Sequence, residues 1–488
     1  DYTGNTLHFR MVRTRKQVER LPSKRRAPCF PPACEPRISS FFAVRKRKSD
    51  DSCPSKLAVD VVKKLHFEND DQPSLRFVAP VLSRTNRLST LGVFDQVPRF
   101  LFDTFAMEAS LSTLVKLAQT SQEFSQRILE FVLSARGRKR LVRDIAQLSG
   151  QQNSLTDPFR MFGLLLKATT CTRNTEERMA ILGNFLLKAP TVSSDLSGWG
   201  RLIRSFVSRW AFEECEKVVS FMLNLEGGWL RRLVDEVVKS EVGSLAAKEM
   251  EARRFLRALL LDQNVENERE ASFWLSCLLR TRINIAEQAR LVMILYAPTK
   301  RVDEQEVIDW RSLCDAVVTS RRDATERLEP IAIVLGRLLI TRTLSNRRYH
   351  WTDNDIFNIV EEISTCPEPW SFDNFVSLLL LGDHTVLPIC LSSRMTHNYA
   401  EEAGLMVATM RTLLHRWREN VASVLQTPLL ATLKALPAAS RRDFLAVITE
   451  AHAKYARELI SSPRAELEEE LRAHHALMPL LIRALATL

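Results

Sequence analysis

"SLSTLVKLAQTSQEFSQRILEFVL", residues 110–133, contains the pattern that decides the fold class. Its apolar residues recur mainly three, four or seven positions apart, which is the period of an amphipathic helix. They are Leu111, Leu114, Leu117, Phe124, Ile128 and Leu129. The polar residues between them lie mainly off this stripe. Helical spacing of this kind continues from about residue 91 to the end of the sequence, so we predict an all-α protein.

Composition supports the same fold class. Only 14 of the 488 residues are glycine, about 3% against a usual ~7%, so a strand-rich fold with many tight turns is not expected. The length allows two to four domains or one extended array. No strict internal repeat is visible, and we therefore predict an irregular helical array over residues 136–488.

Helix boundaries are marked by capping residues and prolines. "TDND" (352–355) and "SRRD" (440–443) each place a hydroxyl three residues before an acid, as in a capping box, and predict helix starts. Prolines divide the C-terminal half into pieces of helix length. "AELEEELRAHH" (465–475) predicts a charged helix whose acids face water, and "MPLLIRALATL" (478–488) predicts a packed terminal helix.

The positive charge of the chain is concentrated at its N-terminal end. Residues 1–50 hold 13 Lys and Arg against four Asp and Glu, whereas the remaining residues are nearly balanced at 56 basic and 54 acidic. With several prolines and little periodicity, residues 1–50 are expected to be a disordered basic tail, followed by a linker over residues 51–90. Any nucleic-acid contact is expected to be weak and to come from this tail.

Two short motifs in the tail indicate partners. "RKRK" (Arg45, Lys46, Arg47, Lys48) is either a nuclear localisation signal or a solvated basic run. "EPRISSFF" (35–42) resembles the peptide that docks into the replication sliding clamp, with Ile38, Phe41 and Phe42 as its apolar anchors and Glu35 where that peptide carries Gln.

Several function classes lack support in the sequence. No apolar run reaches the ~18 residues that a membrane span needs, and no secretory segment is evident. Nine scattered cysteines indicate reduced thiols in the cytosol or nucleus. No phosphate-binding loop, metal-ligand spacing or nucleophile motif occurs. We expect a soluble, non-catalytic protein without cofactor or metal.

"VPRFLFDTF" (97–105) places a proline, suited to the first turn of a helix, before a dense apolar cluster. Ser110 or Ser112 can cap the next helix, which predicts two apolar helices joined by a short turn. The stretch 97–128 resembles an F-box without a gap: Val97-Pro98 stands at the Leu-Pro opening, and Phe100 stands where a Glu is usual.

The rest of the chain resembles the F-box only protein 47 family, from about Gly92 to Ile460. The blocks that carry this resemblance follow the order of the family. They are "RKRLVRD" (138–144), "GLLLK" (163–167), "SFWL" (272–275), "QARL" (288–291) and "WTDNDIFNIVEEIS" (351–364).

This resemblance implies a function and a set of partners. The chain would be the substrate receptor of a Skp–cullin–F-box ubiquitin ligase, with an F-box at 91–135 and a helical body that holds an unknown protein target. The family is associated with meiotic prophase in germline cells, which implies a nuclear or additionally cytoplasmic protein. The residues implied to bind the Skp adaptor are Val97, Pro98, Leu101, Phe102, Phe105, Leu111, Leu114, Leu117, Ser121 and Phe124.

The alternative is a non-ligase nuclear helical scaffold or interaction protein, with nucleic-acid or sliding-clamp contacts through its basic tail. In such a protein, residues 97–128 would pack wholly inside the array.

Overall fold

The computed structural model describes residues 92–148, 157–188, 195–262, 267–315, 317–460 and 464–486. Within these ranges two compact units separate. The N-terminal unit holds the described residues between 92 and 231 together with 258–262, and the C-terminal unit holds 232–257 and 267–486. The basic tail, the linker, the "RKRK" signal and the clamp-type peptide lie outside the described residues. The predictions made for them stay predictions.

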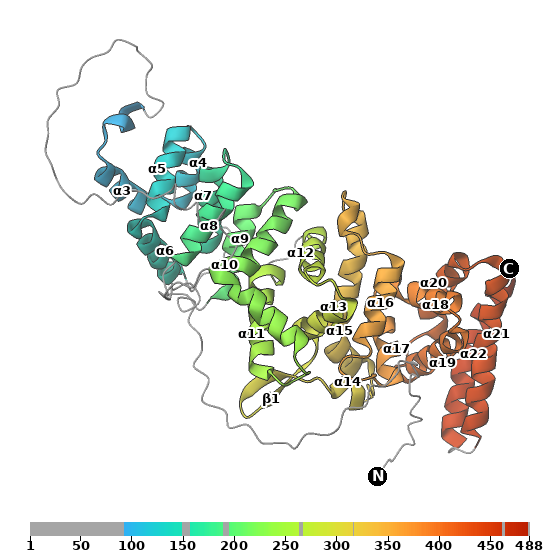
Figure 1. Cartoon of the computed structure of the whole chain (residues 1–488). Helices are drawn as coiled ribbons and strands as arrows, with labels where there is room; N and C mark the ends of the chain where they lie inside the picture. Colours follow the sequence, from blue (N-terminus) through green and yellow to red (C-terminus); the bar gives the residue numbers. More distant parts are fainter. Residues whose placement is uncertain are drawn as a thin grey trace. The chain divides into compact units, whose positions relative to one another are not determined.

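The N-terminal unit is built of short helices (Figure 1). α3 packs on α5 and α6, while α4 and α5 pack on α7, which in turn packs on α9. The aromatic side chains of α7, α8 and α9 meet in its core, where the rings of Phe159 and Trp199 lie 5.2 Å apart. The elements are η1 (Gly92–Gln96), α3 (Arg99–Glu108), α4 (Leu111–Ala118), α5 (Gln122–Leu133), α6 (Ala135–Leu148), α7 (Pro158–Thr170), α8 (Thr175–Leu187), α9 (Leu196–Val207), the first part of α10 (Phe212–Lys239) and most of the π-helical turn η2 (Arg257–Leu261).

The C-terminal unit contains the last part of α10 and the remaining elements, which follow one another from the green α11 to the red α22 in Figure 1. They are α11 (Ala246–Leu256), α12 (Glu268–Arg280), α13 (Ile285–Tyr296), β1 (Thr299–Val302), β2 (Gln305–Ile308), α14 (Ser312–Asp315), α15 (Arg321–Ile340), η3 (Thr341–Thr343), η4 (Arg347–Tyr349), α16 (Asp353–Ile363), α17 (Phe372–Leu381), α18 (Val386–Thr396), α19 (Ala400–Arg416), α20 (Val421–Ala435), α21 (Ala438–Leu459) and α22 (Arg464–Ala486).

The helices of this unit stack in two alternating rows. α15, α17, α19 and α21 form one row, in which each helix packs on the next, and α16, α18, α20 and α22 form the other. Each helix thus contacts its second neighbour in the chain as well as adjacent helices, an arrangement typical of helical repeat proteins. The all-α prediction is confirmed, and the strands β1 and β2 form a single antiparallel hairpin between α13 and α14.

Local capping signals were read correctly in two of three places. Ser110 accepts a hydrogen bond from the Thr113 amide and begins α4, and Thr352 with Asp355 forms a capping box at the start of α16. The prediction that "SRRD" at 440–443 begins a helix was wrong, because α21 already begins after Pro437 and Ser440 lies inside it. The same four letters at 320–323 do begin a helix: Ser320 accepts from the Asp323 amide at the start of α15.

Two further expectations need correction. The stretch 110–133 is divided into α4 and α5, because Ser121 caps a new helix by accepting from the Phe124 amide. The segment 97–133 therefore forms three helices, not two. Prolines also separate helices less often than expected: Pro330, Pro428 and Pro479 lie inside α15, α20 and α22.

The acids of "AELEEELRAHH" do not all face water. The side chain of Glu470 is 1% exposed and forms an ion pair with the buried Arg411 of α19. Its second carboxylate oxygen accepts a hydrogen bond of 2.7 Å from Thr412 Oγ1. Next to this pair, the imidazole rings of His452 and His474 stack with their centroids 3.4 Å apart. This buried polar cluster joins α19, α21 and α22.

The cluster makes the stability of the C-terminal unit depend on pH. Burial, together with the charge of Arg411, lowers the pKa of both His452 and His474 to about 4. The unfolded chain, whose histidines keep a pKa near 6.5, binds more protons between these two values, so acid favours unfolding there. We expect the thermal midpoint to fall as pH is lowered from 7 to 5. The double variant His452→Gln, His474→Gln should flatten this slope in calorimetry, whereas His384→Gln, which removes an exposed imidazole, should leave it unchanged.

Candidate functional site

The first helix of the predicted F-box, α3, has one buried and one exposed side. Phe102 and Ala106 are buried against the unit, with Phe102 only 2% exposed. Around the rest of the helix, Phe100 is 59%, Leu101 48% and Phe105 37% exposed, although the Phe105 ring still lies 6.2 Å from that of Phe102. An isolated exposed leucine is ordinary, but three large apolar side chains on one ten-residue helix form a surface suited to a partner. We call Phe100, Leu101 and Phe105 the α3 apolar face.

The chain just before α3 supports this face. The ring of Phe94, in η1, lies 6.0 Å from that of Phe105 and 5.3 Å from that of Phe124 on α5. The Arg127 guanidinium donates a hydrogen bond of 3.0 Å to the carbonyl oxygen of Phe94. The Phe105 side chain therefore packs on Phe94 at one side, while its outer surface remains exposed to solvent.

Two arginines of α6 bind the C-terminal end of α3. A helix leaves its last four carbonyl groups without partners inside the helix. Arg140, 4% exposed, donates to the Ala106 carbonyl and, over 2.5 Å, to that of Ala109. Arg143 donates over 2.5 Å to the Met107 carbonyl. Positive charge is also favourable at this end of a helix dipole.

Carboxylates hold both arginines in place. Asp144 lies 3.2 Å from Arg140 Nε, and Glu108 accepts a 3.0 Å hydrogen bond from Arg143 Nη1. The hydrogen bond that Arg143 donates to Glu108 raises the pKa of Arg143 above its ordinary value. A third ion pair joins Arg136 and Asp103 over 3.6 Å. We call Arg140 and Arg143 the arginine latch. Both arginines belong to the block "RKRLVRD" (138–144). The sequence indicated a family resemblance for this block but no structural role.

The residues implied to bind an adaptor fall into three groups. Phe102, Leu114 and Phe124 are buried in the unit's own core, so in this structure they hold the hairpin together. Pro98, Leu101 and Phe105 are exposed. The others, Val97, Leu111, Leu117 and Ser121, are half-buried, and Ser121 caps α5. Sequence reasoning treated Phe100 only as a departure from the family, whereas it is the most exposed member of the α3 apolar face.

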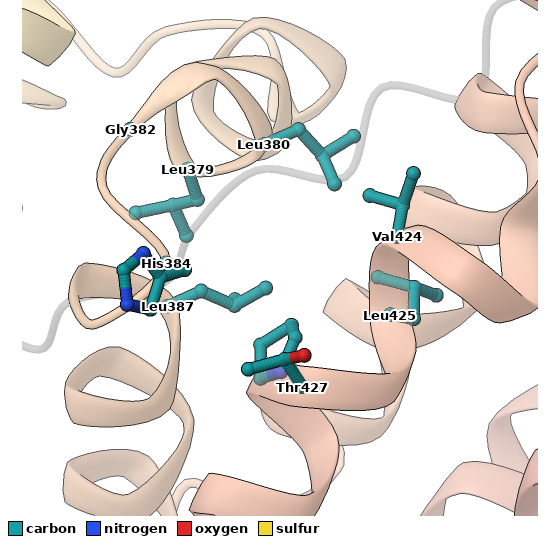
Figure 2. A pocket seen from close by; sticks show the side chains of 9 residues that line it. Leu379, Leu380, Gly382, His384, Leu387, Val424, Leu425 and Thr427 are labelled. Carbon is teal, nitrogen blue, oxygen red and sulfur yellow. The ribbon is translucent and has the colours of Figure 1, made fainter.

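A separate apolar pocket lies in the C-terminal unit, between α17, α18 and α20. Figure 2 shows Leu379, Leu387 and Leu425 around it, with His384 at its edge. Its volume is about 390 Å³. Among its lining side chains only those of His384 and Thr427 are polar, so the pocket offers mainly apolar contact.

Neither a membrane segment nor a metal site emerges from the part of the chain that the structure describes. None of its helices is long and apolar enough to cross a bilayer. Within the same residues, no three His, Cys, Asp or Glu side chains converge as metal ligands. Cys390 is a buried thiol, and burial raises its pKa to about 12, which keeps it protonated.

The two-row stacking of helices agrees with the protein family that the chain matches. The family described as "FBXO47, ARM repeats" matches residues 228–488, more than half of the chain. The chain belongs to this family. ARM repeats are helical units, so the repeat that no strict sequence period revealed is present in the two-row stacking of α15 to α22.

Two curated relatives extend the similarity toward the N-terminus. F-box only protein 47 of Mus musculus is 25% identical over 399 residues, which cover 76% of this chain and 82% of the relative. F-box only protein 47 of Homo sapiens is 24% identical over 402 residues, covering 77% and 83%. These relatives support the interpretation of the chain as an F-box protein and confirm the family resemblance seen in its sequence blocks.

The arginine latch can be tested by substitution. Arg140→Met leaves the carbonyls of Ala106 and Ala109 without their donor, and we expect a loss of about 1–3 kcal/mol in the free energy of unfolding of α3. Hydrogen exchange should show faster exchange of the α3 amides, with α7 to α9 unaffected. Lys139→Met, which removes an exposed neighbouring charge, serves as the control. Equal protection of α3 in both variants would contradict the latch.

Proposed function

We propose that the chain is the substrate-receptor subunit of a Skp–cullin–F-box ubiquitin ligase. The observation that carries the proposal is the α3 apolar face, at the position where the F-box resemblance puts adaptor contact. Burying a large apolar side chain is worth about 1.5–3 kcal/mol, so a partner that covers three of them gains substantial binding energy. The names of the two relatives are consistent with such a role.

The chain itself would carry out no chemistry in this complex. Its part is to place a bound target near a ubiquitin-transferring enzyme held by the cullin, and this requires surfaces and no catalytic residue. The arginine latch supports this adaptor role, because it fixes the α3 apolar face to the rest of the N-terminal unit. The ARM repeats supply an extended surface on which a target protein can be held.

The scaffold alternative expects residues 97–128 to be packed wholly inside the array. The exposure of Phe100, Leu101 and Phe105 argues against it, since an interior hairpin would not leave that side of α3 open.

Adaptor binding is tested by the double variant Leu101→Asp, Phe105→Asp. Two carboxylates on the α3 apolar face cannot be buried without a large desolvation penalty, so we expect co-purification with the Skp adaptor and cullin to be lost. Because the Phe105 ring also packs on Phe94, the thermal midpoint is compared with that of Leu101→Asp alone, which changes only a more exposed side chain and should already weaken binding while the midpoint stays near wild type. Ile333→Asp, at a residue of α15 that is also 48% exposed, is the matched control and should bind as wild type. Binding retained by the double variant would rule out this face as the docking site.

For place and process we propose nuclear action in meiotic prophase of germline cells, in homologue pairing and synapsis. The family resemblance and the basic "RKRK" run at Arg45–Lys48 support this part. Replacing all four residues of that run by Ala should shift a fluorescently tagged chain from nucleus to cytoplasm. Unchanged nuclear signal would exclude the run as the import signal, and normal synapsis in germ cells lacking the protein would exclude the meiotic role.

A further inference from the structure

Arg178, on α8, carries a charge that the described protein does not neutralise by contact. The residue is 9% exposed, and its Nε atom is buried without a hydrogen-bond partner. The charge of Glu214, in the first turn of α10, attracts the guanidinium, but no described carboxylate lies within ion-pair distance of it. Burial lowers the pKa of Arg178 below its ordinary value, and the charge of Glu214 opposes this shift. Burying a charge without an ion pair costs desolvation free energy, and a bound anion would offset that cost.

The guanidinium is held in a fixed orientation by an aromatic ring. Its central carbon lies 3.8 Å from the centroid of the Trp210 ring and 6.0 Å from that of Phe206. Such stacking fixes the plane of the group. Because Nε is buried, the donors left for a ligand are those of the two terminal Nη groups, which lie in that plane. Trp210 belongs to the turn between α9 and α10, residues 208–211, and its place there brings Arg178 over that turn.

Two further cations meet the same turn. Lys167, from α7, donates to the carbonyl oxygen of Ser208 over 2.5 Å and to its hydroxyl over 2.9 Å. Arg209 is exposed and adopts a left-handed backbone with φ of 63°, an uncommon conformation for a residue with a side chain. The charges of Arg209 and Arg178 add to burial in lowering the pKa of Lys167, as expected for neighbouring cations.

We propose that Lys167, Arg178 and Arg209 bind the phosphate of a phosphorylated serine or threonine in a partner protein. A phosphate monoester carries about −1.5 to −2 charges at pH 7 and three strong acceptor oxygens, which match three donors on separate elements. Arginine presents a planar fork of donors to such an anion, and lysine adds a point charge. The three residues are called the phosphate cluster.

The surroundings favour a single phosphate over a nucleic acid. The first turn of α8 carries Glu176 and Glu177, and that of α10 carries Glu213 and Glu214. A nucleic-acid backbone would have to bring several phosphates past these acids, which repel it. A protein segment with one phosphate and basic flanking residues meets attraction from both the phosphate cluster and the acids. The ligand class we assign is therefore a phosphoprotein segment with basic neighbours.

This inference names a ligand class for the receptor proposed above, and it rests on that proposal only in treating the ligand as a target. The phosphate cluster lies on α7, α8 and the α9–α10 turn, whereas adaptor binding is assigned to α3. The phosphopeptide test and the adaptor-binding test can therefore fail independently of each other.

The test uses the full chain and two peptides of one sequence, with phosphoserine or serine between two lysines on each side. Isothermal titration calorimetry should detect binding of the phosphopeptide alone. Arg209→Glu reverses an exposed charge, so the fold should survive, and we expect at least about a tenfold loss of affinity. Lys188→Met, at the exposed end of α8, is the control and should bind as wild type. Adaptor binding should be equal in all variants.

Arg178→Met separates a binding role from a structural one. Without ligand, the lost stacking on Trp210 and the lost attraction to Glu214 offset the removal of a buried charge, so the variant should nearly keep the thermal midpoint, and it should lose phosphopeptide binding. A lowered midpoint with unchanged peptide affinity would overturn the proposal, as would equal affinity of wild type for the two peptides. A short single-stranded RNA that binds through Arg209 when the phosphopeptide does not would overturn it in favour of nucleic acid.

Discussion

The pairing of two arginines with the carbonyl end of α3 is the contact on which the candidate docking site depends. A ten-residue helix is marginal on its own in water, and its apolar outer side gives it no further support from the fold. Arg140 and Arg143 supply the donors that the last turn lacks, from a helix about 35 positions further along the chain. Because the last turn is held in this way, Phe100, Leu101 and Phe105 can remain outside.

Local signals in the sequence predicted much of the fold. Helical spacing identified the class, and Ser110 and Thr352 marked helix starts, because a cap depends on residues only three positions apart. The predictions of helix starts and of burial failed where residues outside the local motif determine the structure. The letters "SRRD" begin one helix and lie inside another, since Pro437 had already started α21. Glu470 is buried because Arg411, on another helix, pairs with it, and no spacing within its own helix records that.

The candidate site shows the same division. The F-box resemblance directed attention to Leu101 and Phe105, whose exposure depends on which side of α3 meets α5 and α6. It also assigned partner contact to Phe102, Leu114 and Phe124, which the structure buries in the chain's own core. The arginine latch and the stacking of Arg178 on Trp210 join residues that lie more than thirty positions apart, and only the folded chain brings them together.

The two-row stacking of α15 to α22 has a consequence for how this family changes over evolutionary time. Each helix packs only on a few neighbouring helices. A substitution that changes the packing of one helix can therefore be compensated by a second substitution one or two helices away. Such an architecture accumulates sequence change layer by layer without a global core to constrain it. The two relatives share about 25% identity with this chain across four-fifths of their own length, and such independence of the layers allows substitutions to spread along the whole array.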